Sequence, residues 1–230
     1  ADHRDLHAFP TRRSSDLVAG DLDLDGDVDL VAGAVANELL VLLNDGRGGF
    51  VHLPVTGLGS TSRCLDLGDF NQDGVLDLVR SRADGYVETL LGIGDGRFGV
   101  PVPLDRQGSL ETHGVVAGDL DGDGHDDVLG AYSSVGDISF WAGRGDGTFA
   151  PRQPATAGVP GHGLDLNSAA DFDAFDYDQD GDLDVVFAHV SQNRLLFFRN
   201  QGDGTFAAGV SHGSTTATVI GVSAPLAPPP

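Results

Sequence analysis

The chain contains no lysine, and its 13 basic residues, all arginine, face 35 acidic residues in a total of 230. The formal net charge is −22 at pH 7. A protein that binds nucleic acid needs a basic surface to displace counterions from the phosphates, and this composition does not provide one. We therefore expect no nucleic-acid partner.

Cysteine and long apolar runs are also scarce. Cys64 is the only cysteine, so no disulfide can form within the chain, and a buried position in a strand is its simplest interpretation. No apolar run reaches the roughly 18 residues that a membrane-spanning helix needs. We therefore expect no membrane span.

The acidic residues are spaced in register, which argues against a disordered acidic chain. Nine-residue segments recur with an oxygen-bearing side chain at positions one, three, five and nine, and with glycine at position six. We name them acidic loops one to four, and they are Asp21–Asp29, Asp69–Asp77, Asp119–Asp127 and Asp176–Asp184.

A second landmark follows each acidic loop at a nearly constant distance. It is a turn rich in glycine and aspartate, and it ends in Phe50, Phe98, Phe149 or Phe206. Each phenylalanine lies 21 or 22 residues after the last aspartate of its loop. Two landmarks in register across four copies predict an internal repeat. We expect each of these phenylalanines to pack between neighbouring repeats.

Each repeat resolves into four short apolar runs separated by turn residues, and no longer stretch has helical periodicity. Four antiparallel strands in about 50 residues, repeated, predict an all-β fold of β-propeller blades. The predicted blades cover residues 17–62, 63–113, 114–168 and 169–220. Outside them we expect a non-native or disordered leader and a proline-rich linker or tail, at residues 1–16 and 221–230 respectively.

The acidic loops have the oxygen-rich pattern that Ca²⁺ prefers. Four carboxylates within nine residues repel one another unless a cation lies between them. An EF-hand would place a bidentate glutamate at position twelve, but that position holds Ala32, Arg80, Gly130 and Phe187, so the EF-hand is excluded. Mg²⁺ retains its waters, and Zn²⁺ prefers histidine or cysteine. We predict about four Ca²⁺ ions, one per loop, with a structural role.

The predicted ligands are the side chains at positions one, three, five and nine and the backbone carbonyl at position seven. In that order of position they are Asp21, Asp23, Asp25, Asp27 and Asp29; Asp69, Asn71, Asp73, Val75 and Asp77; Asp119, Asp121, Asp123, His125 and Asp127; and Asp176, Asp178, Asp180, Asp182 and Asp184. Loop two has an amide in place of one carboxylate, so we expect it to bind calcium most weakly.

The pattern Gly-Asp-Leu/Phe-x-x-Asp-Gly-x-x-Asp-Leu/Val, followed by Gly-Asp-Gly-Thr-Phe, resembles the FG-GAP/VCBS repeats of bacterial secreted proteins. It is also similar to the calcium-binding blades of the integrin alpha-chain N-terminal propeller. The resemblance covers residues 17–210 and implies a propeller, usually of about seven blades, with Ca²⁺ between the first two strands of a blade. Only four repeats are present, so we expect an open arc or fragment of a larger propeller.

The resemblance also implies an extracellular or cell-surface protein. No Ser/His/Asp or Cys/His arrangement is suggested by spacing, so we expect no catalytic site and no enzyme activity. We favour a non-catalytic, calcium-stabilised binding or adhesion propeller segment. Two alternatives are an accessory propeller of a secreted hydrolase or lyase whose catalytic domain is absent, and a carbohydrate-binding lectin.

The expected partner is an unknown protein or glycan ligand, together with further blades or domains of the same full-length chain. Trp141 and Tyr132 could line a sugar-binding surface, although packing in the core is the simpler interpretation.

Overall fold

The computed structural model describes eight stretches of the chain, residues 17–34, 38–55, 58–106, 112–132, 137–155, 169–189, 193–207 and 209–213. The predicted leader and tail lie outside these residues. Within them the structure is all strand and turn, and no helix is long and apolar enough to cross a membrane.

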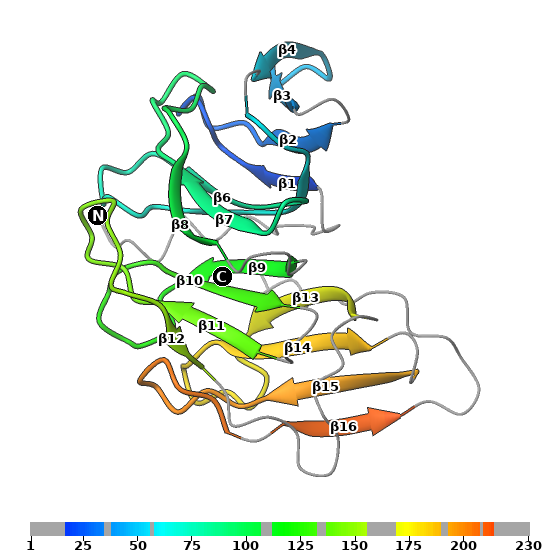
Figure 1. The fold of residues 1–230 in the computed structure, drawn as a ribbon. Helices are drawn as coiled ribbons and strands as arrows, with labels where there is room; N and C mark the ends of the chain where they lie inside the picture. The colour runs from blue at the N-terminus through cyan, green and yellow to red at the C-terminus, as the bar shows by residue number, and fades with distance from the viewer. Residues whose placement is uncertain are drawn as a thin grey trace.

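Sixteen strands form four separate sheets, each antiparallel and each built from four strands in chain order (Figure 1). Sheet 1 consists of β1 (Leu17–Gly20), β2 (Asp29–Ala34), β3 (Glu38–Asn44) and β4 (Phe50–Val55). Sheet 2 consists of β5 (Ser62–Gly68), β6 (Asp77–Arg82), β7 (Tyr86–Leu90) and β8 (Val102–Arg106). Sheet 3 consists of β9 (Thr112–Gly118), β10 (Asp127–Tyr132), β11 (Asp137–Trp141) and β12 (Gln153–Pro154). Sheet 4 consists of β13 (Ala169–Phe175), β14 (Asp184–His189), β15 (Arg194–Phe198) and β16 (Val210–Gly213).

Both faces of the inner sheets are apolar, because successive side chains of a strand point to opposite faces. In β11, Ile138 and Phe140 belong to the core that sheet 3 shares with sheet 4. The neighbouring Trp141 belongs to the core shared with sheet 2, as does Cys64. A third core fills the space between sheets 1 and 2. The interpretation of Trp141 and Cys64 as core residues is confirmed, while the side chain of Tyr132 lies outside the described residues.

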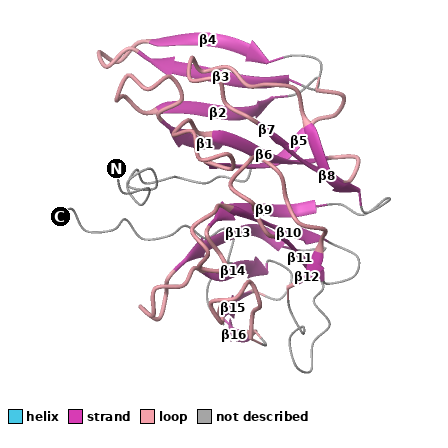
Figure 2. Ribbon diagram, turned by 90° about the vertical axis from the view of Figure 1, so that its left-hand side faces the viewer, coloured by secondary structure: helices cyan, strands magenta, loops and turns pink. Residues whose placement is uncertain are grey.

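The sheets follow one another as blades along one row. The first strand of each sheet packs against the first strand of the next, so β1 contacts β5, β5 contacts β9 and β9 contacts β13. Sheets 1 and 4 lie at opposite ends of this row (Figure 2). The predicted all-β fold of four propeller-type blades is confirmed, and the acidic loop of each blade connects its first and second strands.

The expectation that every turn phenylalanine packs between repeats is wrong at the first repeat. Phe206 is buried, and Phe98 and Phe149 are partly buried against the cores between sheets. Each of the three packs toward the preceding sheet. Phe50 is exposed, because sheet 1 has no preceding sheet among the described residues.

Candidate metal centres

Each acidic loop reverses the chain through two residues with positive φ. The glycine at position six has φ between 84° and 101° in all four loops. A Cβ at Gly26 or Gly181 would meet nothing within 4 Å, so glycine is required there by its backbone conformation and not by space. Position four is also left-handed, and the sequence did not reveal this, because it holds Leu24, Gln72 and Gln179 in three of the four loops.

The aspartate at position nine ties its loop to the glycine-rich turn of the same sheet. Asp127 is buried, and its Oδ2 accepts the N–H of Leu120 at 2.8 Å while its Oδ1 accepts the N–H of Gly143 at 2.7 Å. Gly143 starts the turn that ends in Phe149. The same two bonds, to position two and to the first residue of the turn, are made by Asp29, Asp77 and Asp184.

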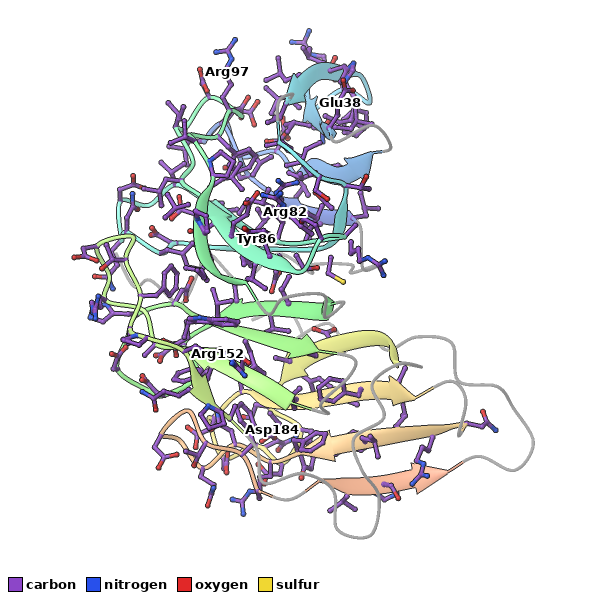
Figure 3. The ribbon with its side chains drawn as sticks, in the orientation of Figure 1. Glu38, Arg82, Tyr86, Arg97, Arg152 and Asp184 are labelled. Carbon is purple, nitrogen blue, oxygen red and sulfur yellow. The ribbon has the colours of Figure 1, made fainter. Side chains whose placement is uncertain are left out.

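These bonds place the acidic loop and the turn at one end of each sheet. The arrow of β14 points away from this end and the arrow of β15 points back toward it (Figure 1). Asp184, the first residue of β14, is labelled at this end of sheet 4 (Figure 3).

Loop carboxylates also hold the backbone of the loop tip. In loop three, Asp119 Oδ2 accepts the N–H of Gly124 at 3.1 Å, and Asp123 Oδ1 accepts the N–H of His125 at 2.9 Å. In all four loops the N–H of position six donates to the carboxylate of position one, and the N–H of position seven donates to the carboxylate of position five. The loop conformation is therefore built from its own side chains.

Three of the loops bring acidic side chains together closely enough to share a metal ion. Carboxylate oxygens from positions one, three and nine lie within 4.8 Å of one another in loops one, three and four. These groups are Asp21, Asp23 and Asp29; Asp119, Asp121 and Asp127; and Asp176, Asp178 and Asp184.

The position-five aspartates lie outside these groups of three, and they are Asp25, Asp123 and Asp180. Among the described residues, loop two forms no such group, because its third position is Asn71. The Asn71 amide nitrogen instead donates to Asp73 Oδ2 at 2.9 Å. The position-seven carbonyls remain predicted ligands.

The chemistry of the loops fits a hard divalent cation. Asp21 Oδ1 is buried without a hydrogen-bond partner, and leaving such an oxygen unsatisfied costs about 1–3 kcal/mol. Burial is the main cause that raises the pKa of Asp77 and of Asp127 to about 7, and the neighbouring carboxylates contribute in the same direction. The pKa of Asp29 and that of Asp184 are raised for the same reasons. A cation among these oxygens would relieve both the burial and the repulsion.

Loop four differs from the others because an arginine that follows β15 pairs with its tip. Arg199 Nε lies 2.6 Å from Asp178 Oδ2, and Arg199 Nη2 donates to Asp180 Oδ2 at 2.8 Å. The hydrogen bond from Arg199 lowers the pKa of Asp180. The contact was not predicted from the sequence. A signal was present, since an arginine stands where the other repeats have Leu43, Leu91 and Ala142.

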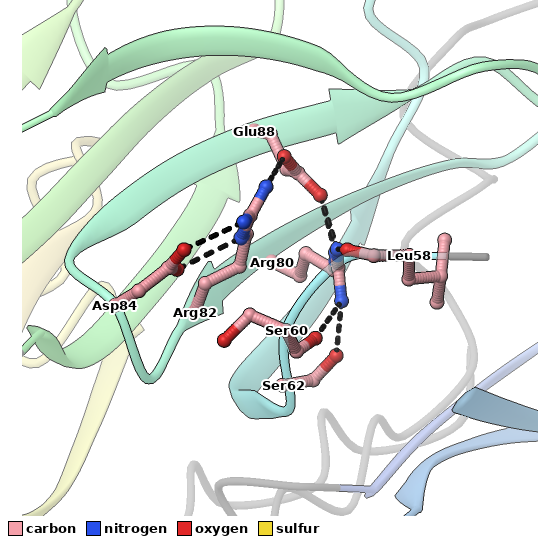
Figure 4. A network of polar contacts seen from close by, with 7 residues as sticks. All are labelled: Leu58, Ser60, Ser62, Arg80, Arg82, Asp84 and Glu88. Atoms are coloured by element: carbon pink, nitrogen blue, oxygen red, sulfur yellow. Dashed lines mark hydrogen bonds and ion pairs between the residues drawn. The ribbon is translucent and has the colours of Figure 1, made fainter. Parts of the chain in front are cut away.

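A second cluster of charged residues, in sheet 2, serves the packing of the chain. The buried Arg80 pairs with the buried Glu88 and also donates to the Ser62 hydroxyl and to the carbonyls of Leu58 and Ser60 (Figure 4). Its guanidinium thereby holds the segment that enters sheet 2. Since Nε, Nη1 and Nη2 are each engaged within the chain, Arg80 is not available to a ligand.

The repeat pattern and the fold both have counterparts among known proteins. The sequence model of the FG-GAP-like repeat matches residues 21–80, 69–130, 119–174 and 176–225. A structure of a lectin from Agrocybe aegerita, described as specific for non-reducing terminal N-acetylglucosamine, has a TM-score of 0.59 and 20% identity. That match covers 86% of this chain and 52% of the lectin.

The structure of BBS1N in complex with ARL6DN has a TM-score of 0.52 and 12% identity, and the match covers 96% of this chain and 57% of that one. The chain thus spans roughly half the length of these structures, and the likeness shows a shared fold. No curated protein sequence matches the chain.

Proposed function

Because the chain belongs to the FG-GAP-like repeat family, we propose that it is a non-catalytic, calcium-stabilised propeller segment that acts in binding or adhesion outside the cell. The observation that carries the proposal is the convergence of three aspartates in each of three loops at the same end of their sheets. Repetition of one site supports a structural role for the metal, since a catalytic site is usually single.

Calcium is supported by the donor set. Each group of three offers only carboxylate oxygens. In loop one, the Oδ1 atom of Asp21 is buried without a hydrogen-bond partner. Calcium tolerates irregular geometry and many oxygen ligands, and weak oxygen sites are filled at the millimolar calcium concentrations outside cells. This supports an extracellular location.

The metal assignment can be tested by calorimetric titration of the metal-stripped chain with calcium chloride, with magnesium chloride as the matched control. We expect about four calcium ions per chain and much weaker binding of magnesium. No uptake of calcium would contradict the assignment.

A lectin is the second candidate, and the fold shared with a sugar-specific lectin favours it. The chain carries exposed aromatic surface at Tyr177, and aromatic faces commonly stack on sugars. Probing a glycan array with the calcium-loaded chain tests this candidate. Calcium-dependent binding of one glycan class would support the lectin, and a blank array would leave a protein ligand as the expected partner. The accessory propeller of a hydrolase or lyase stays a prediction, which the full-length open reading frame would test.

A further inference from the structure

One kind of joint is repeated between the successive sheets. The carbonyl of the position-two residue of an acidic loop accepts a hydrogen bond from the glycine-rich turn of the next sheet. Gly96 N–H donates to Leu22 O at 3.1 Å, and Gly147 N–H donates to Phe70 O at 2.9 Å. At the third joint the side-chain amide of Asn200 donates to the carbonyl of Leu120 at 2.8 Å.

The same residues also supply the apolar contact of the joint. The rings of Phe70 and Phe149 meet edge to face with centroids 5.3 Å apart. The position-two side chains Leu22, Phe70 and Leu120 are only 2%, 1% and 1% exposed. Each joint therefore has two halves, a position-two side chain on one sheet and a turn on the next.

The turn glycines complete the contact. A Cβ at Gly96 would come within 2.5 Å of the Leu43 side chain, and a Cβ at Gly204 within 2.6 Å of the Phe140 side chain. Both neighbours belong to the preceding sheet. At the equivalent Gly48 of sheet 1, a Cβ would meet nothing within 4 Å.

Sheet 4 carries the first half of a fourth joint. Its position-two residue is Tyr177, which is 39% exposed and lies edge to face with Phe197, 5.5 Å between centroids. Leu195 and Phe197 correspond in register to Ile138 and Phe140, which are buried against sheet 4. In sheet 4 the two side chains are only half-buried.

Sheet 1 carries the second half. Its turn ends in Phe50, which is 50% exposed, whereas Phe206 at the same position of sheet 4 is 3% exposed. On the same face of sheet 1 as Phe50, Leu40 and Leu42 of β3 are half-buried. Leu39 and Val41, on the opposite face, are buried against sheet 2. Among the described residues, each end of the row thus presents one half of the joint that the chain makes three times.

We propose that a second copy of this chain docks head to tail, with the Tyr177 surface of one copy against the Phe50 surface of the other. This contact would continue the row of sheets, because Tyr177 and Phe197 present the kind of surface against which the turn phenylalanines of sheets 2 to 4 pack. Such a contact joins two different surfaces, so it forms a closed ring if the rotation closes and an open chain otherwise. Acidic loop four carries Tyr177 into the contact, so calcium should strengthen the association by reducing repulsion between two chains of charge −22.

Sedimentation velocity of the full chain in millimolar calcium, over a range of concentrations, tests the proposal. The wild-type chain is expected to self-associate. Phe50→Asp and Tyr177→Asp should each weaken this association at least about tenfold, since each buries a charge at the centre of the contact. Val100→Asp adds the same charge at a residue that is 81% exposed and lies outside the proposed contact, and it should associate like the wild type.

Mixing the two variants separates this geometry from others. A Phe50→Asp chain keeps an intact Tyr177 surface, and a Tyr177→Asp chain keeps an intact Phe50 surface. The mixture should therefore form a one-to-one complex that neither variant forms alone. Circular dichroism confirms that each variant is folded before the comparison is made.

Three results would overturn the proposal. They are a wild-type chain that stays monomeric at all concentrations, a Tyr177→Asp chain that associates normally while Phe50→Asp does not, and a mixture without a complex. The second result would indicate a symmetric contact between two Phe50 surfaces, and the first would leave the two ends to further blades of the same full-length chain.

Discussion

Position nine and the tip of each acidic loop lie close together in sequence, but they have different environments. The ninth aspartate is buried and accepts at least two backbone hydrogen bonds in every loop. The tip at positions three to five is exposed or half-buried, and its side chains bond mainly within the loop. The ninth aspartate therefore serves the fold through hydrogen bonds as well as joining the carboxylate group, whereas the tip mainly carries charge that a cation can relieve.

Truncating aspartate side chains of loop three to alanine should separate the structural role of position nine from the metal-binding role of the tip, with the largest expected effect. In metal-free protein, Asp127→Ala should lower the free energy of unfolding by about 2–5 kcal/mol, because the N–H groups of Leu120 and Gly143 lose their acceptor in a buried site. Asp121→Ala, the matched control at the tip, should lower stability less without metal, because its hydrogen bond from the Asp123 N–H is exposed, and it should reduce the stabilisation by calcium. Urea denaturation in chelator and in calcium measures both, and equal losses in chelator would contradict the distinction.

The pH dependence of the metal-free protein tests the burial of position nine. Folded Asp77 and Asp127 have a pKa of about 7 against an ordinary 3.8, so the folded state binds more protons between these pH values. Stability should therefore fall as pH rises from about 4 to about 7. Urea midpoints of calcium-free protein across this range measure the effect.

The matched control for the pH experiment is the double variant Asp77→Asn, Asp127→Asn, whose midpoint should change less over the same range. Saturating calcium should reverse the trend, because metal binding requires deprotonated carboxylates. A midpoint that is independent of pH in the metal-free wild type would contradict the assignment.

Charge at the tip should determine the order of calcium affinity among the loops. Asn71→Asp gives loop two the ligand set of loop three, and we expect its affinity to rise roughly tenfold. The reverse change, Asp121→Asn, should weaken loop three by a similar factor. Calorimetric titration of both variants tests the order, and unchanged affinities would show that position three does not contact the metal.

Arg199 should modulate loop four by a smaller factor. Arg199→Gln removes a cation that pairs with Asp178 and Asp180, so calcium should bind loop four a few-fold more tightly. Arg97→Gln removes a similar exposed pair with Asp95, which belongs to no acidic loop, and should leave the affinity of loop four unchanged. If both variants behave like the wild type, the arginine does not compete with the metal.

The sequence revealed the parts of the fold that depend on repetition. Two landmarks in register were sufficient to predict four sheets of four strands, because acidic loops and turns occur only where strands end. Features that depend on a neighbour were not visible. Phe50 ends a turn rich in glycine and aspartate, as its more buried counterparts do, and the position of sheet 1 in the row explains its exposure.

Within the candidate centres, the sequence identified the acidic residues but not their separate uses. Position five was predicted as a ligand, yet Asp123 lies outside the group of converging carboxylates and bonds the backbone of its own loop. The bonds made by position nine were also missed, because their second partner lies 15 or 16 residues further along the chain.

The central claim is that calcium in the acidic loops stabilises the folded row of sheets. Its most direct test is the thermal melt of one preparation in chelator, in chelator with excess magnesium, and in excess calcium. Because several sites would bind only the folded state, we expect calcium to raise the melting temperature by at least about 10 °C, and magnesium to raise it much less. The same melting temperature in chelator and in excess calcium would contradict the claim.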